Sequence, residues 1–259
     1  MLTVANYDAT PPLQSAIWVP LNLILFQREE TLRPLPRTDE RAQHVLNVLR
    51  RQVGDAFDAG IVNGPRGKAT LLAITDRQLE LSFAWTTEFT DPDPIALIIG
   101  LPRPQTARKI LQETAALGVA ALHFVRCDKA EPSYADSTLW HSGEWQRHLE
   151  AGAAQAFCTG IPAVTHGQLF SDAIQSLPAS ANRIALDNYE APSALSQCQP
   201  ANVTPLTLAF GPERGWSAGE RDLLREQAFA LAHLGTRVLR LETAIVAALA
   251  IVKAQRGLM

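Results

Sequence analysis

The sequence predicts an α/β protein in which helices cover both faces of a mostly parallel β-sheet, preceded by a small β-rich module. Two observations support this fold class. From about residue 95 onward, continuous apolar runs of strand length alternate with amphipathic helical segments, which is typical of a parallel sheet buried on both faces. Before that, residues 63–67 read Asn-Gly-Pro-Arg-Gly between two apolar segments, which is a strong hairpin signal.

The chain divides into four segments by composition. The first lacks periodicity, the second is rich in strand and turn signals, the third is polar and proline-containing like a linker, and the fourth alternates strands with helices. We therefore expect an irregular arm, a β-rich module, a linker and an α/β domain over residues 1–18, 19–85, 86–94 and 95–259.

Apolar runs and helical spacing give the expected elements. In the module we expect a strand over 21–26, a short helix from Thr38, and hairpin strands over 57–62 and 68–74. In the α/β domain the expected strands are 95–99, 119–125, a short one around 163–164, 183–186, 206–210 and 230–234. The expected helices are 105–117, 144–157, 168–177 and 242–255.

Composition restricts the class of protein. The chain has 259 residues, 19% charged residues and a net charge of −3, which weighs mildly against nucleic acid as a partner, although local basic patches decide phosphate affinity. Three widely spaced cysteines fit neither a zinc site nor a disulfide framework, and no cluster has metal-ligand spacing. With no secretory signal and no membrane span apparent, we expect a soluble protein of the reducing cytoplasm.

Two glycine-containing loops near the C-terminus are the strongest candidates for a ligand site. Gly211–Gly215 follows an apolar strand, and Ser217 with Glu220 after it has capping-box spacing. Glycines allow close approach to the backbone, and a helix N-terminus presents free amides. From the residues alone, an ordinary strand-to-helix turn explains this loop equally well.

The second loop is Leu234–Arg240, which brings two arginines and an apolar pair before the final helix. That helix is apolar almost all round, so it must be buried. Its alanines could admit a second helix, as in a subunit interface, or could simply lie in the core. Both loops would lie at the carboxyl ends of strands, where α/β sheets bind ligands.

The sequences of these two loops resemble those of one enzyme family. Residues 234–244 read Leu-Gly-Thr-Arg-Val-Leu-Arg-Leu-Glu-Thr-Ala, similar to the Leu-Gly-x-Arg-(Ile/Val)-Leu-Arg-x-Glu-Thr-Ala pattern of the RsmE-type 16S ribosomal RNA (uracil-N3)-methyltransferases, which belong to the SPOUT class. The preceding loop is similar to the family's Gly-Pro-Glu-Gly-Gly. Further similar segments begin at Arg41, Val53, Leu101, Arg108, Leu117, Ser133 and Glu150.

The resemblance implies a SPOUT-type sheet with a deep trefoil knot, a PUA-like β-barrel as the small RNA-binding module, and a homodimer. It implies S-adenosyl-L-methionine as cofactor and the 16S rRNA of the small ribosomal subunit as substrate. The loops would hold the cofactor mainly through backbone and apolar groups. The implied cofactor residues are Leu186, Asp187, Phe210, Gly211, Pro212, Glu213, Gly215, Leu234, Gly235, Val238, Leu239, Arg240 and Thr243.

Methylation at uracil N3 requires loss of a weakly acidic proton and stabilisation of the resulting anion. Arg240 and Arg237 are our candidates for this charge stabilisation or for phosphate contact. Glu213 is a candidate proton acceptor, and anchoring of its loop is an equal alternative. Because N3 lies on the Watson–Crick edge, the base must be unpaired or extruded.

Basic residues near these segments are candidates for RNA contact, although a solvated surface charge is the alternative for each, and packing for His44. The candidates are Arg41, His44, Arg50, Arg51, Arg103, Arg108 and Lys109. The chain departs from the family at Arg214, where Gly is usual, and near Cys158, where many relatives carry arginine. These departures keep open a related methyltransferase with another RNA target, or a non-catalytic RNA-binding or ribosome-assembly protein.

Overall fold

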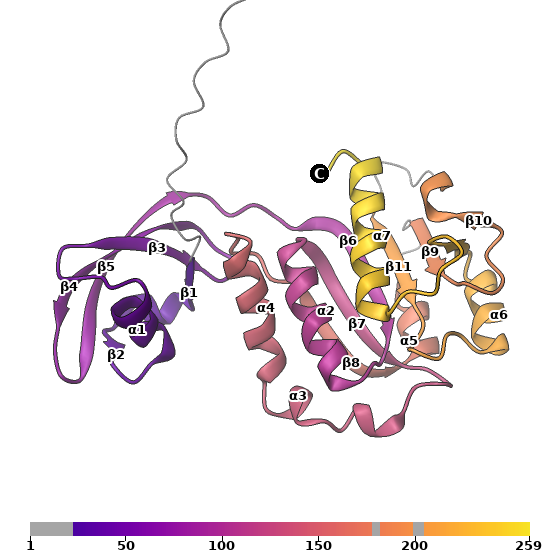
Figure 1. Cartoon of the computed structure of the whole chain (residues 1–259), viewed down its shortest axis with the longest axis horizontal. Helices are drawn as coiled ribbons and strands as arrows, with labels where there is room; N and C mark the ends of the chain where they lie inside the picture. Colours follow the sequence, from indigo (N-terminus) through magenta and orange to yellow (C-terminus); the bar gives the residue numbers. More distant parts are fainter. Residues whose placement is uncertain (1–22, 178–181, 199–204) are drawn as a thin grey trace, which may run out of the picture.

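The computed structural model describes residues 23–177, 182–198 and 205–259. The predicted arm at residues 1–18 and the start of the strand predicted over 21–26 lie outside these ranges. A small β-rich module stands beside a larger α/β domain (Figure 1). Residues 88–92 connect the last strand of the module to the first strand of the domain.

The module is a five-stranded sheet in the order β1-β3-β4-β5-β2. The predicted hairpin is confirmed, because β3 and β4 pair antiparallel around the turn at residues 63–67. Phe26, Phe57, Leu71 and Leu79 pack inside the module with Val45 of the short helical segment. Its elements are β1 (Ile24–Phe26), η1 (Arg28–Leu32), β2 (Leu35–Pro36), α1 (Glu40–Gln43), η2 (His44–Val48), β3 (Ala56–Ile61), β4 (Arg66–Ile74) and β5 (Gln78–Thr87).

The α/β domain contains the predicted parallel sheet. Its seven strands have the order β10-β12-β9-β11-β6-β7-β8, and every neighbouring pair runs parallel. The strands are β6 (Asp93–Gly100), β7 (Val119–Arg126), β8 (Ala163–Leu169), β9 (Asn182–Leu186), β10 (Ser193–Ala194), β11 (Leu206–Phe210) and β12 (Ala230–His233).

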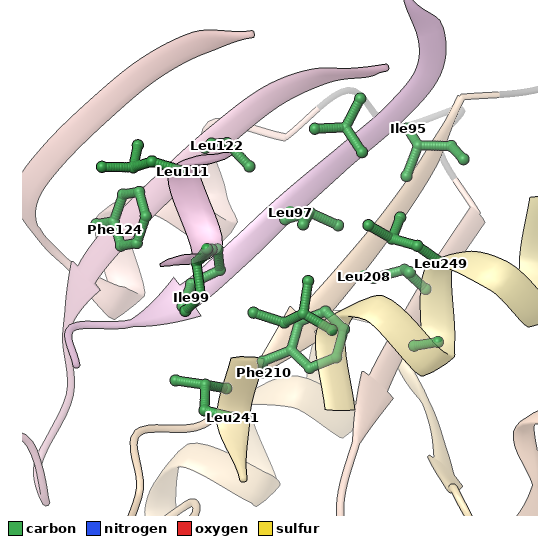
Figure 2. Packing of buried hydrophobic residues seen from close by; sticks show 14 of the residues in the cluster. Ile95, Leu97, Ile99, Leu111, Leu122, Phe124, Leu208, Phe210, Leu241 and Leu249 are labelled. Carbon is green, nitrogen blue, oxygen red and sulfur yellow. The ribbon is translucent and has the colours of Figure 1, made fainter. Parts of the chain in front are cut away.

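Helices cover both faces of this sheet, as predicted. Ile95, Leu97 and Ile99 of β6 point into a core shared with α2 and α7 (Figure 2), whereas Ile98 points into a second core on the opposite face, with α5 and α6. The helices are α2 (Pro104–Ala116), η3 (Pro132–Tyr134), α3 (Thr138–His141), α4 (Glu144–Gln155), α5 (Phe170–Gln175), η4 (Leu195–Gln197), α6 (Ala218–Glu226) and α7 (Leu241–Gln255). Within the described ranges, no helix is long and apolar enough to cross a membrane.

Three predicted boundaries in this domain were wrong. The strand expected around 163–164 extends as β8 to Leu169, because it pairs with β7 as far as Arg126. The following helix therefore begins at Phe170 rather than at residue 168. The helix predicted over 144–157 ends at Gln155, and Phe157 has a left-handed φ of 58° that no helix can continue.

The turn of the module's hairpin contacts the α/β domain directly. Thr159 donates its Oγ1 hydrogen to the Gly64 carbonyl at 2.7 Å, and the Ile161 N–H donates to Asn63 Oδ1 at 3.0 Å. Arg66 Nη1 donates to the Phe157 carbonyl at 2.6 Å. These contacts attach the module to the loop that follows α4.

Candidate active site

One cavity of about 890 Å³ opens at the carboxyl ends of β6, β9, β11 and β12. Those four strands are neighbours in the sheet, so the loops that follow them converge, as in other α/β proteins that bind ligands there. The lining residues are Arg103, Gln105, Thr106, Lys109, Leu186, Asp187, Asn188, Tyr189, Phe210, Gly211, Pro212, Glu213, Arg214, Gly215, Trp216, Leu234, Arg237, Val238, Leu239, Arg240, Leu241, Glu242 and Ala244.

The loop over Gly211–Gly215 is held against the end of β6. A Cβ on Gly100 would lie only 2.5 Å from the backbone N of Pro212, so the two backbones touch and only glycine fits. Gly215 has a φ of 69°, and its N–H donates to the Pro212 carbonyl at 2.7 Å. The loop is thus a tight turn with a fixed position in the cavity wall.

Glu213 anchors this loop to the beginning of α2. Its Oε1 accepts a hydrogen bond from the backbone N–H of Arg103 at 3.0 Å. The Arg103 side chain in turn donates from Nε to the Tyr134 hydroxyl at 3.2 Å. Of the two interpretations left open by the sequence, the anchoring one therefore has an observed contact.

Trp216 connects the Gly211–Gly215 loop to the end of β9. Its side chain is 1% exposed, its Nε1 donates to the Leu186 carbonyl at 3.0 Å, and its ring packs against Phe170. Directly after it, Ser217 and Glu220 form the predicted capping box at the start of α6. The loops after β9 and β11 are consequently fixed to each other and to a helix.

Asp187 lines the cavity, and its side chain is engaged within the protein. Its carboxylate is buried, receives two hydrogen bonds from Arg221 at 2.9 and 3.2 Å, and accepts a third from the Glu190 N–H at 3.0 Å. Burial alone would raise the pKa of Asp187, but the hydrogen bonds and the charge of Arg221 outweigh it and lower the pKa. Its side chain thereby fixes the loop after β9, which lines the cavity through Leu186, Asp187, Asn188 and Tyr189.

The loop over Leu234–Arg240 forms the opposite wall. Leu234, Leu239 and both predicted catalytic arginines, Arg237 and Arg240, line the cavity, and the two arginines are exposed. Val238 lines it too and is 83% exposed. We also expected Gly235 of this loop and Thr243 of α7 at the cofactor, and neither lines the cavity.

Two of the predicted RNA contacts lie at this cavity and one does not. Arg103 and Lys109 line it, and Lys109 Nζ lies 3.4 Å from Glu242 Oε1 of α7. Arg108 instead pairs with Glu144 at 2.5 Å, joining α2 to α4. The hydrogen bond from Arg108, with a smaller one from His148, lowers the pKa of Glu144 to about 2.

The other RNA candidates lie in the module. The guanidinium of Arg41 pairs with Glu30 and Asp39 and lies over the Phe26 ring, so it also has a structural role there. The remaining three are placed differently on the surface. Arg50 is exposed with a left-handed φ of 52°, whereas His44 and Arg51 are partly buried.

Sequence reasoning missed several lining residues, among them Asn188, Tyr189, Gln105 and Thr106. Asn188 and Tyr189 directly follow Asp187, which the sequence had already placed at the cofactor, so extending that loop by two residues would have found them. Among the described residues, no group of three or more His, Cys, Asp or Glu side chains could hold a metal ion.

A parallel sheet with a cavity built from the loops at its carboxyl edge is a common ligand-binding arrangement in α/β enzymes, and similarity to known proteins defines the class. Residues 90–253 match the family described as the RNA methyltransferase domain. The chain is therefore an RNA methyltransferase by family. It belongs, more narrowly, to the ribosomal RNA small subunit methyltransferase E family, as its relatives show.

The relatives match along most of their length. The protein of that name from Treponema pallidum is 33% identical over 247 residues, covering 90% of this chain and 91% of the relative. The one from Bacillus subtilis is 26% identical over 232 residues, covering 86% and 90%. The crystal structure of the Neisseria gonorrhoeae protein, bound to S-adenosyl methionine, has the same fold with a TM-score of 0.74 at 23% identity, covering 90% of this chain and 97% of that one.

Proposed function

We propose that this protein transfers a methyl group from S-adenosyl-L-methionine to N3 of a uridine in the 16S rRNA of the small ribosomal subunit. The observation that carries the proposal is the convergence of the loops after β9, β11 and β12 on one cavity. These are the loops whose sequences resemble the family's cofactor loops.

The cavity suits this cofactor. Its volume of about 890 Å³ is that of a site for a ligand of this size, and its wall combines backbone groups with apolar side chains. The residues that would hold the cofactor are Leu186, Phe210, Gly211, Pro212, Gly215, Leu234, Val238, Leu239 and Arg240. When bound, the cofactor supplies an electrophilic methyl group on a sulfonium ion.

The residues of this chain orient the uracil and stabilise its charge. Loss of the N3 proton leaves a negative charge on the base, and Arg240 is an exposed cation on the cavity wall that would stabilise it. Arg237, exposed on the same wall, would either stabilise this charge or contact a phosphate. Glu213 positions the loop by its bond to Arg103. The extruded base would enter from the side where Arg103 and Lys109 lie.

Three further features belong to this proposal. Residues 19–85 would form a PUA-like RNA-binding barrel, and residues 95–259 the knotted SPOUT domain. For the knot, the support is that Gln255 of α7 donates to the carbonyls of Ser196 and Cys198, so these two residues after β10 lie against the final helix. For a homodimer, it is the half-exposed small face of α7 at Val246, Ala247 and Ala250.

The deciding experiment is methyl transfer to small subunits from a strain that lacks its own enzyme, followed by identification of the modified nucleoside. We expect 3-methyluridine at one position. A different methylated nucleoside would indicate a related enzyme with another target. Failure to bind S-adenosylmethionine in calorimetry would indicate an RNA-binding or assembly protein on this fold.

A further inference from the structure

Tyr189 is an aromatic side chain that its own fold does not bury. It is 79% exposed and lines the cavity. Among the large hydrophobic residues exposed in the described part of the chain, it is the only aromatic one. Packing in a core therefore does not explain why a large ring stands at this position.

The surrounding residues hold this exposed ring in place. The Arg221 guanidinium lies over it at 5.3 Å from the ring centroid, and Arg221 itself is held by the buried carboxylate of Asp187. A Cβ on Gly215 would lie 3.7 Å from Tyr189 Cε2, so the ring edge borders the Gly211–Gly215 loop. One face of the ring is thus backed by a cation, and little freedom is lost when a ligand stacks on the ring.

The charges beside the ring fit a polyanion. Arg214 and Arg237 line the same cavity and are exposed, and among the described residues neither forms an ion pair within the chain. Single-stranded RNA is recognised by this combination of aromatic rings that stack on bases and cations that contact phosphates.

We propose that Tyr189 is a stacking platform for an unpaired nucleobase of the RNA substrate, and that Arg214 and Arg237 contact the phosphates on either side of it. This proposal rests on the proposed function, because it takes RNA as the ligand. It gives Arg214, which replaces the family's usual glycine, a task in substrate binding. Tyr189 is 79% exposed whereas Phe210 of the cavity wall is buried, so the tyrosine ring is the more accessible of the two to an incoming strand.

The test compares Tyr189→Ala and Tyr189→Phe with the wild-type protein, each saturated with S-adenosylhomocysteine. Binding of a fluorescein-labelled oligouridine is measured by anisotropy. Loss of one base stack weakens binding roughly tenfold in Tyr189→Ala, whereas Tyr189→Phe keeps the ring and stays within about twofold of wild type. Leu169→Ala, which removes another exposed side chain at the end of β8 and outside the cavity lining, is the matched control and leaves affinity unchanged.

Three results for Tyr189→Ala would contradict the proposed stacking role. The first is unchanged affinity for oligouridine. The second is a loss of S-adenosylmethionine affinity in the absence of RNA, which would mean that the ring contacts the cofactor, and the third is a changed oligomeric state in sedimentation, which would place the ring in a subunit interface. Oligouridine binding does not depend on which nucleoside is methylated, so failure of the proposed target in the small-subunit assay is a separate outcome.

Discussion

At the scale of single residues, the cavity separates side chains that shape the wall from side chains left free to act. Asp187, Glu213 and Trp216 are all engaged in contacts that fix loops. Arg237 and Arg240 are exposed on the same wall. Arg237 and Arg240 are therefore the candidates for contact with the reacting groups.

Replacing Arg240 by alanine is expected to lower turnover by about a hundredfold or more, because a preorganised donor to the uracil anion is lost. Its backbone begins α7 through the bond from the Ala244 N–H to the Arg240 carbonyl, which alanine retains, so the circular dichroism spectrum should not change. Methyl transfer to small subunits is the measurement, with Arg147→Ala on the exposed surface of α4 as the control. Full activity in Arg240→Ala would show that its role is misassigned.

Replacing Arg221 by methionine is expected to lower the free energy of unfolding by roughly 3–5 kcal/mol, because the substitution leaves the buried carboxylate of Asp187 unpaired. The lowered pKa of Asp187 means that the pair's contribution is present above the ordinary aspartate pKa and is lost as the pH falls through the lowered native value. In the variant, burial without a cation raises that pKa, so protonation relieves the penalty. The stability deficit should therefore be larger at about pH 7 than at about pH 5 in urea unfolding.

Arg225→Met is the control for that substitution. Arg225 pairs with Glu190 and Asp222 on the exposed surface, and an exposed pair contributes only about 0–1 kcal/mol. An equal loss of stability in Arg221→Met and Arg225→Met would contradict a special role for the buried Arg221–Asp187 pair. So would a loss of stability in Arg221→Met that does not depend on pH.

At the scale of elements, the sequence predicted most of the strands and helices of the α/β domain, because these are specified by patterns of neighbouring residues. Continuous apolar runs specify buried strands, and the serine and glutamate of the capping box specify where α6 begins. Partners distant in sequence were not predictable. The length of β8 depends on pairing with β7, and nothing near Arg41 or Tyr189 in sequence reveals that Glu30 or Arg221 engages them.

The close packing of α2 on α4 gives a prediction for these elements. A Cβ on Gly152 would lie 2.1 Å from the Gln112 carbonyl oxygen, so Gly152→Ala must push the helices apart and should destabilise the protein by roughly 1–3 kcal/mol. Gly219 of α6 has nothing within 4 Å of its virtual Cβ, so Gly219→Ala should be neutral or slightly stabilising. Thermal unfolding of both variants is the measurement, and equal shifts would refute the packing argument.

At the scale of the whole molecule, the module and the domain are joined by specific hydrogen bonds in addition to the chain connection. The predicted hairpin turn forms this junction. Through it, the sheet proposed to bind RNA is attached to the domain that holds the cavity. Residues on the two parts can then contact one RNA strand in a fixed relation.

The proposed homodimer gives a prediction at this scale. Ala250→Glu places a charge on the half-exposed small face of α7, so we expect a wild-type dimer in sedimentation velocity and a folded monomer for this variant. Ala218→Glu puts the same charge at the exposed start of α6 and should leave the dimer intact. A monomeric wild type, or a dimeric Ala250→Glu, would exclude this helix as the interface.

Arg103 joins two binding events through one residue. Its backbone N–H holds the loop proposed to carry the cofactor, and its side chain contacts Tyr134 at the proposed RNA entrance. Anything that stiffens the loop thereby also orders the residue that meets RNA. Thermodynamic linkage then requires reciprocity: whatever factor the cofactor adds to RNA affinity, RNA must add to cofactor affinity. A single peptide group would thereby couple the affinities of the two substrates.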